Sequence, residues 1–262
     1  MDEAVASALE DDSHYLSKLA INLTRGGDGV IIGDAPVRPE LFAPGTTWAR
    51  GGVLTTMVDL VSGHVPDGPN GPTVDMRLRV VARPPASGRI RLVARPLRVG
   101  RRLIVSETAL SAGDDAAPFA WATSTFINNI VADFFDDHRA EPPPMDEPSF
   151  DEFLGATVRD EATLELEPNP RIDNGIQMTV QGGAQALLAE MAAAHRLAPG
   201  EPLVATDLDI RFLDRLHVGP LAARATPVVS DDGVLRANVT LFDAGKDDHV
   251  VSVVAVTMAR AH

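Results

Sequence analysis

The chain has 262 residues, 45% of them apolar, and carries a formal net charge of −14 with no cysteine. Its length and apolar fraction suffice for one large domain or two of ordinary size. The lack of cysteine excludes disulfides, thiolate metal sites and a cysteine nucleophile, and the negative charge argues against a nucleic-acid partner. No apolar run is long enough to span a membrane, and the first residues are acidic where a signal peptide would be basic. We therefore expect a cytoplasmic protein with no membrane partner.

The charge is divided unevenly between the two halves of the chain. Residues 1–131 carry 13 basic and 14 acidic side chains, a net charge of −1. Residues 132–262 carry 10 basic and 23 acidic side chains, a net charge of −13. An anionic ligand should therefore prefer the first half.

In the first half, the pattern predicts an amphipathic helix over residues 2–20 and a strand over 29–37. A loop rich in proline and glycine then leads to a buried helix that begins at Gly51, and a turn follows at 66–72. Four strands come next, in which apolar residues alternate with polar ones as on a sheet with one packed face. Their expected ranges are 73–83, 89–97, 103–111 and 119–128.

The second half repeats this order of elements. A strand over 156–167 precedes a helix that begins at Gly182, and four more strands follow, near 204–213, 221–229, 235–242 and 249–259. We therefore expect two related domains, 1–131 with its N-terminal helix and 156–262. Residues 132–155 should join them as an acidic, proline-rich linker with a short helix.

One motif in the buried helices occurs twice. Four residues of the first helix recur 131 positions later: Gly51, Gly52, Asp59 and His64 return as Gly182, Gly183, Glu190 and His195. Each helix is apolar around nearly all of its surface, which is typical of a buried helix. A lone carboxylate there costs free energy unless it is paired or used. The duplication therefore favours a functional role for at least one copy.

The order of elements and the Gly-Gly-x6-Asp/Glu motif resemble hotdog-fold acyl-CoA thioesterases of the phenylacetyl-CoA thioesterase type. The resemblance implies an α+β fold with two tandem hotdog units, each an antiparallel sheet wrapped around a central helix, that form an intramolecular pseudo-dimer. It also implies an acyl-CoA substrate, with CoA part of that substrate and no separate cofactor, and a homo-oligomer of two such chains. The histidine that precedes the glycines in that family is replaced here by Arg50 and by Gln181.

Helix geometry predicts how the two motifs combine. Seven residues of helix rise about 10 Å, so neither carboxylate reaches the glycines of its own helix. If the helices lie antiparallel, Asp59 faces Gly182 and Gly183, and Glu190 faces Gly51 and Gly52. The unpaired N–H groups at each helix start would form an oxyanion hole for a thioester carbonyl. The carboxylate would activate water or attack the carbonyl itself, and the thiolate would leave without a strong acid.

Several arginines bear on substrate binding. Arg50 could form a salt bridge with Glu190 or bind a substrate phosphate. The hairpin residues Arg98, Arg101 and Arg102 suit the phosphates of CoA, although a solvated hairpin tip would have the same composition. The aligned loop of the second half, residues 230–233, is acidic. We therefore expect one working CoA groove and one degenerate or differently used site.

Two other functions stay open at this point. The Asp59-x4-His64 spacing superficially resembles an element of hotdog enoyl-CoA hydratases, but five helical residues turn about 500°, which points the two side chains about 140° apart. A non-catalytic acyl-CoA binding protein is the second alternative, because the usual histidines are missing. The other histidines, His14, His138, His217, His249 and His262, have no metal-ligand spacing, so no metal is expected.

Overall fold

The computed structural model describes most of the chain in seven ranges: 14–66, 68, 70–114, 116–128, 148–173, 179–229 and 234–261. Its first half contains the helix α2, Gly51–Ser62, and two short 3-10 helices, Ser17–Leu19 and Pro39–Leu41. The strands of this half are β1 Asn22–Arg25, β2 Ile31–Pro36, β3 Thr73–Val80, β4 Arg89–Val99, β5 Leu103–Ser111 and β6 Ala120–Ile127.

The second half contains the short helix α3, Phe150–Leu154, and the long helix α4, Gly182–Leu197. Its strands are β7 Thr157–Val158, β8 Thr163–Leu166, β9 Leu203–Phe212, β10 Leu221–Val228, β11 Leu235–Asp243 and β12 His249–Arg260. No helix in the described ranges is long and apolar enough to cross a membrane.

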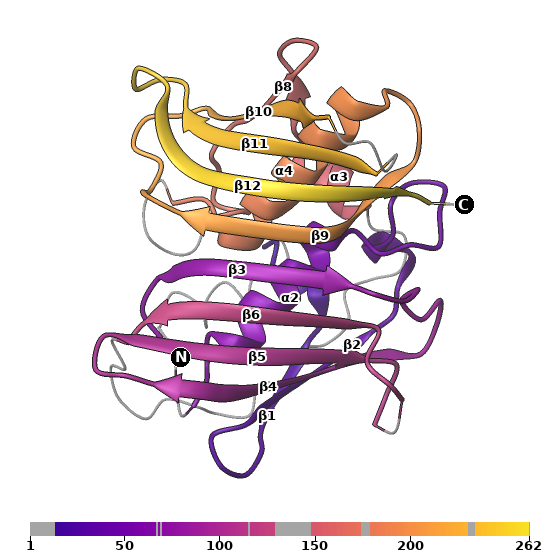
Figure 1. Ribbon diagram of the computed structural model, residues 1–262, viewed down its shortest axis with the longest axis vertical. Helices are drawn as coiled ribbons and strands as arrows, with labels where there is room; N and C mark the ends of the chain where they lie inside the picture. The colour runs from indigo at the N-terminus through magenta and orange to yellow at the C-terminus, as the bar shows by residue number, and fades with distance from the viewer. Residues whose placement is uncertain are drawn as a thin grey trace.

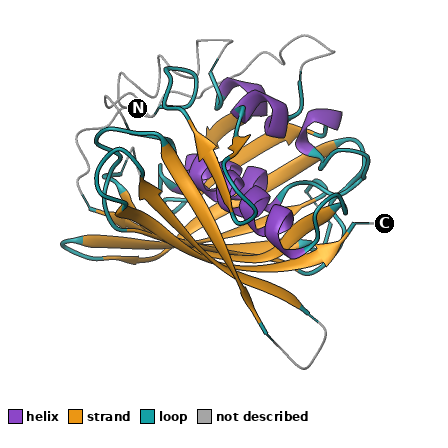
Figure 2. Ribbon diagram, turned by 90° about the horizontal axis from the view of Figure 1, so that it is seen from above, coloured by secondary structure: helices purple, strands orange, loops and turns teal. Residues whose placement is uncertain are grey.

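The twelve strands of the described ranges belong to one antiparallel sheet in the order β1-β2-β4-β5-β6-β3-β9-β12-β11-β10-β8-β7. The order is symmetric about the central pair, since β6, β5, β4 and β2 follow outward from β3 as β12, β11, β10 and β8 follow from β9 (Figure 1). The sheet curves around the helices, which lie together on its concave side (Figure 2). The expected α+β architecture is therefore present, with one helix preceding each central strand.

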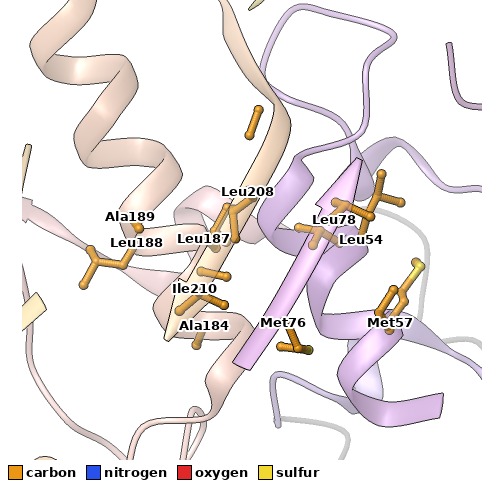
Figure 3. Close-up of a cluster of buried hydrophobic side chains, with 14 of the residues drawn as sticks. Leu54, Met57, Met76, Leu78, Ala184, Leu187, Leu188, Ala189, Leu208 and Ile210 are labelled. Carbon is orange, nitrogen blue, oxygen red and sulfur yellow. The ribbon is translucent and has the colours of Figure 1, made fainter. Parts of the chain in front are cut away.

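The seam between the halves is the β3–β9 pair. Its inward residues Met76 and Leu78 lie opposite Ile210 and Leu208, and all four are at most 1% exposed. Side chains from α2 and α4 pack on the same side of this pair, as Figure 3 shows for Leu54 and its labelled neighbours. The two halves therefore share one hydrophobic core, and burial of this apolar surface holds them together.

The outward face of the seam is charged. Arg77 and Arg79 of β3 both bond to the Asp207 carboxylate of β9, at 3.0 and 3.2 Å. Asp75 lies opposite Arg211 in the same ladder. Opposite charges directly across a strand pair favour this register over one shifted by a residue.

Two glycines let the helices cross at close range. A Cβ on Gly52 would lie 2.4 Å from the Cα of Leu187, and one on Gly183 would lie 2.0 Å from Thr56 Oγ1. The start of each helix thus contacts the middle of the other, so α2 and α4 run antiparallel. The sequence motif predicts that these glycines lie at an oxyanion hole. Helix packing is a second requirement for them, which the structure adds.

Most predicted elements are confirmed, with three differences. Residues 14–20 of the predicted 2–20 helix form a bend and a 3-10 turn, and residues 1–13 lie outside the described residues. The strand β1 was not predicted, and the predicted strand 156–167 is divided into β7 and β8 by a turn in which Asp160 Oδ1 accepts from the Ala162 N–H. Residues 132–147 of the predicted linker 132–155 lie outside the described residues, and the short helix expected in the linker is present as α3.

Candidate active site

The Asp59 carboxylate is held by two side chains that come from different parts of the chain. Thr73 Oγ1 donates to Asp59 Oδ1 at 2.8 Å, and Gln181 Nε2 donates to Asp59 Oδ2 at 3.0 Å. Thr73 is the first residue of β3, and Gln181 is the N-cap of α4. The site therefore forms only when the start of α4 lies against the second half of α2.

The orientation of the Gln181 amide is fixed by its role as a helix cap. Its Oε1 accepts the Ala184 N–H of the first turn of α4 at 3.0 Å. An amide oxygen accepts and an amide nitrogen donates, so Nε2 must face Asp59 as a donor. A cap of this kind supplies a partner for an N–H that the helix cannot pair internally.

The start of α4 lies beside the carboxylate. A Cβ on Gly182 would lie 3.2 Å from Asp59 Oδ2. Within the part of the chain that the structure describes, the N–H groups of Gly182 and Gly183 donate no hydrogen bond. Two N–H donors at the positive end of a helix dipole thus lie next to a carboxylate.

Burial changes the acidity of Asp59. The low polarity around this carboxyl raises its pKa from the ordinary 3.8 to about 6, and the Thr73 hydroxyl acts in the opposite direction. The carboxylate is therefore ionised at neutral pH and is a stronger base than an exposed aspartate. A pKa close to the working pH is what general base catalysis favours.

The Glu190 carboxylate has a different environment. It is fully buried, and Gly52 N–H donates to Oε2 at 2.7 Å while Ala205 N–H donates to Oε1 at 2.7 Å. Burial raises the pKa of this carboxyl, while the Arg50 charge and the two N–H groups act in the opposite direction. The N–H of Gly52 is therefore already bonded to protein and is not open to a substrate carbonyl.

Arg50 completes this closed network. Its guanidinium makes a two-point contact with Asp151 of α3, donates to the Leu203 carbonyl at 2.7 Å and lies 3.8 Å from Glu190 Oε1. Arg50 is 8% exposed. Of the two roles expected for Arg50, the structure shows the salt bridge with Glu190, because this burial and these partners leave the guanidinium no free face for a phosphate.

The two sites differ by small changes at matching positions. Glu190 is one methylene longer than Asp59 and so reaches the backbone N–H groups of the facing helix and strand. Gln181 replaces the charged Arg50 at the helix cap. Thr73, which donates to Asp59, corresponds to Ala205, whose N–H donates to Glu190.

Two residues that contact the candidate sites, Thr73 and Asp151, were not predicted from the sequence. Thr73 could have been found by aligning the starts of the two central strands, because Thr73 in the first half corresponds to Ala205 in the second. Asp151 gave no signal, since its ion pair with Arg50 joins residues 101 positions apart.

The basic hairpin lies at the same end of the strands as Thr73, which donates to Asp59. Arg98, Arg101 and Arg102 are exposed around the turn between β4 and β5. In the ladders, Leu103 pairs with Ile127, and Phe126 pairs with Thr73. The β5 side of the hairpin turn is thus two strands from Thr73, which donates to Asp59, a lateral separation of about 10 Å, and Arg98 on β4 is three strands away. The acidic loop 230–233 of the second half lies outside the described residues.

The histidines of the two helices do not face their carboxylates. His64 Nδ1 lies 2.7 Å from the Leu60 carbonyl, and His195 Nε2 lies 3.2 Å from the Asp160 carbonyl. Among the described residues, Asp59 shares no hydrogen bond with His64. The Asp/His pair needed for hydration is therefore not assembled.

Comparison with known proteins defines the fold. No family model and no curated protein sequence matches the chain. A hotdog-fold protein of unknown function from Alicyclobacillus acidocaldarius is similar over 95% of this chain and 98% of its own, with a TM-score of 0.66 at 12% identity. The tesB protein of Mycobacterium avium subsp. paratuberculosis covers 96% and 99%, with a TM-score of 0.63 at 15% identity. The acyl-CoA thioesterase II TesB2 of Mycobacterium marinum covers 91% and 94%, with a TM-score of 0.56 at 13% identity. The chain therefore has a hotdog fold.

Proposed function

We propose that this chain is a thioesterase that hydrolyses acyl-CoA at the site formed by Asp59, Thr73 and Gln181. One observation carries the proposal. The Asp59 carboxylate is held by two side-chain donors beside the N–H groups of Gly182 and Gly183, which bond to none of the described residues, whereas the equivalent Glu190 site is filled by the chain itself. The structural similarity to the acyl-CoA thioesterase II TesB2 of Mycobacterium marinum supports the same activity.

The proposed reaction uses each group in one role. Asp59 accepts a proton from a water molecule, whose oxygen attacks the thioester carbonyl carbon. The carbonyl oxygen gains negative charge and accepts hydrogen bonds from the N–H groups of Gly182 and Gly183. The carbon–sulfur bond then breaks, giving the carboxylic acid and the CoA thiolate, which takes the proton back from Asp59 or from solvent. Thr73 and Gln181 position the carboxylate.

CoA is favoured as the leaving group by the basic hairpin. Arg101 and Arg102 are exposed about 10 Å laterally from β3 and Arg98, on β4, about 14 Å, close enough for an extended CoA to reach from the thioester to the hairpin. Arginine is well suited to bind phosphate. The first half of the chain also carries far less negative charge than the second.

We also propose that the sheet symmetry reflects two tandem hotdog units in one chain, 1–131 and 156–262, which form a pseudo-dimer. Each unit supplies a helix, and the Asp59 site needs both, because Asp59 comes from the first unit and Gln181 from the second. The pairing of two chains and the cytoplasmic location stay predictions from the sequence.

The test is thiol release from a panel of acyl-CoAs of different chain length. Wild type should release CoA from at least one of them, and Asp59→Asn should lower kcat about a hundredfold or more, as expected for the loss of a general base. Asp114→Asn, which changes an exposed carboxylate, is the control and should match wild type. Saturable binding with no release from any acyl-CoA would replace the proposal by the binding-protein alternative, and full activity of Asp59→Asn would exclude the residue assignment.

A further inference from the structure

A cluster of ligand-type side chains lies apart from the two carboxylate sites. It consists of Asp214 in the loop after β9, His217 three residues further on and His249 at the start of β12. Asp214 Oδ2 lies 2.8 Å from His249 Nε2 and 3.3 Å from His217 Nε2. The three ligand atoms all lie within 4.8 Å of one another. Residues 217 and 249 come together only in the folded chain, so sequence spacing could not show this cluster.

The backbone around His217 is held by hydrogen bonds to a buried carboxylate. The fully buried Asp243 carboxylate at the end of β11 accepts the N–H groups of His217, Val218 and Gly219 at 2.8, 2.9 and 2.8 Å. It also accepts from the Gly245 N–H, in the turn that leads to His249, at 3.2 Å. One side chain therefore fixes the loop of one histidine against the hairpin of the other.

Asp214 is oriented as well. Its Oδ1 accepts the Arg215 N–H at 2.8 Å, which turns Oδ2 toward both imidazoles. The two imidazole rings lie nearly perpendicular, at 70°, with centroids 5.8 Å apart. Two nitrogens and one carboxylate oxygen therefore converge on one point at the protein surface, and they come from two neighbouring loops.

We propose that Asp214, His217 and His249 form a binding site for a divalent transition-metal ion, with Zn²⁺ as the expected occupant. Imidazole nitrogen and carboxylate oxygen are ligands that Zn²⁺ binds at about 2.0–2.2 Å, whereas Ca²⁺ and Mg²⁺ prefer oxygen ligands alone. Three protein ligands on an accessible surface leave a coordination position for water. Groups that hold the ligands in position, as Asp243 does here, are typical of metal sites. Bound metal would tie the β9–β10 loop to the β11–β12 hairpin.

The test is Zn²⁺ binding by tag-free protein that has been treated with a chelator and dialysed. Calorimetric titration with ZnCl₂ should give one saturable site per chain, and His217→Ala and His249→Ala should each weaken that site tenfold or more. His195→Ala is the matched control, since His195 lies outside the cluster, and it should bind as wild type does. Co²⁺ gives a second readout, because its visible absorption in an imidazole site should appear with wild type and be lost in both cluster variants.

Two results would overturn the proposal: no saturable Zn²⁺ or Co²⁺ binding by wild type, or equal binding by wild type and both variants. If one alanine variant does not fold, His249→Gln allows the same comparison, because glutamine is closer in size to histidine than alanine is. Because the readout is metal binding, it is independent of whether the Asp59 site hydrolyses thioesters.

Discussion

Replacing Asp59 by asparagine should make the protein more stable as it removes activity. The carboxyl has a pKa of about 6 in the folded chain instead of 3.8, because the surrounding protein desolvates it. A carboxyl whose pKa is raised by folding binds more protons in the folded chain than in the unfolded chain between those values. Its ionisation therefore destabilises the fold: the penalty is absent well below pH 3.8, grows as the pH rises toward 6, and is complete above 6.

The size of the effect follows from this shift. A difference of about two pKa units corresponds to about 3 kcal/mol at pH 8. Asparagine carries no charge and can still accept from Thr73, but its amide nitrogen would face the Gln181 donor, and the lost bond costs about 1 kcal/mol. The variant should therefore be about 2 kcal/mol more stable than wild type at pH 8. At pH 5 much of the penalty has gone, so its advantage should shrink by about 1.4 kcal/mol.

Thermal melting of the two proteins at both pH values measures this difference. For a chain of this length, 2 kcal/mol corresponds to a rise in Tm of roughly 5 °C at pH 8. Asp114→Asn removes an exposed carboxylate and should leave the Tm within about a degree at either pH. The reasoning is refuted if Asp59→Asn is less stable than wild type at pH 8, or if its advantage is the same at pH 5.

Three further predictions concern the site and its support. The kcat/KM for thioester hydrolysis should be constant above pH 7 and fall tenfold per unit below about pH 6, as the base becomes protonated; a pH-rate profile that is flat down to pH 5 would exclude this base. Gly183→Ala should lower the free energy of unfolding by about 3 kcal/mol, because its Cβ would overlap Thr56, while Gly27→Ala, which has open space around it, should change little; equal unfolding midpoints would refute the packing argument. Arg50→Met should lower the free energy of unfolding by about 3 kcal/mol or more, because Glu190 loses its buried counter-charge. The kcat per folded molecule should stay unchanged. Denaturant titration and a rate assay together test this prediction.

Periodicity and turn residues predicted most of the fold. The long strands and both central helices could be placed because alternation, glycine pairs and proline turns are local signals. The prediction that each carboxylate faces the start of the other helix followed from the repeat and from helix rise alone, since Asp59 is too far along its helix to reach Gly52. The structure shows that arrangement in the contacts of Asp59 with Gln181 and of Glu190 with Gly52.

The difference between the two sites could not be predicted, because it depends on contacts between distant residues. Whether Arg50 binds a phosphate or a carboxylate is decided by Asp151, on a short helix whose position the sequence did not give. Whether the Glu190 carboxylate is bonded to backbone N–H groups depends on the extra methylene of its side chain and on the position of the Ala205 N–H. The convergence of His217 and His249 is likewise a property of two loops that meet only in the folded sheet.

Of the two related carboxylate sites, we expect only the Asp59 site to perform hydrolysis. The most direct test compares kcat for CoA release by Asp59→Asn and Glu190→Gln, at equal concentrations of folded protein and with the best acyl-CoA of the panel. We predict a loss of about a hundredfold or more for Asp59→Asn and a value within about twofold of wild type for Glu190→Gln, whose carboxylate is already bonded to Gly52 and Ala205. A large loss in Glu190→Gln with little change in Asp59→Asn, or equal partial losses in both, would contradict the account.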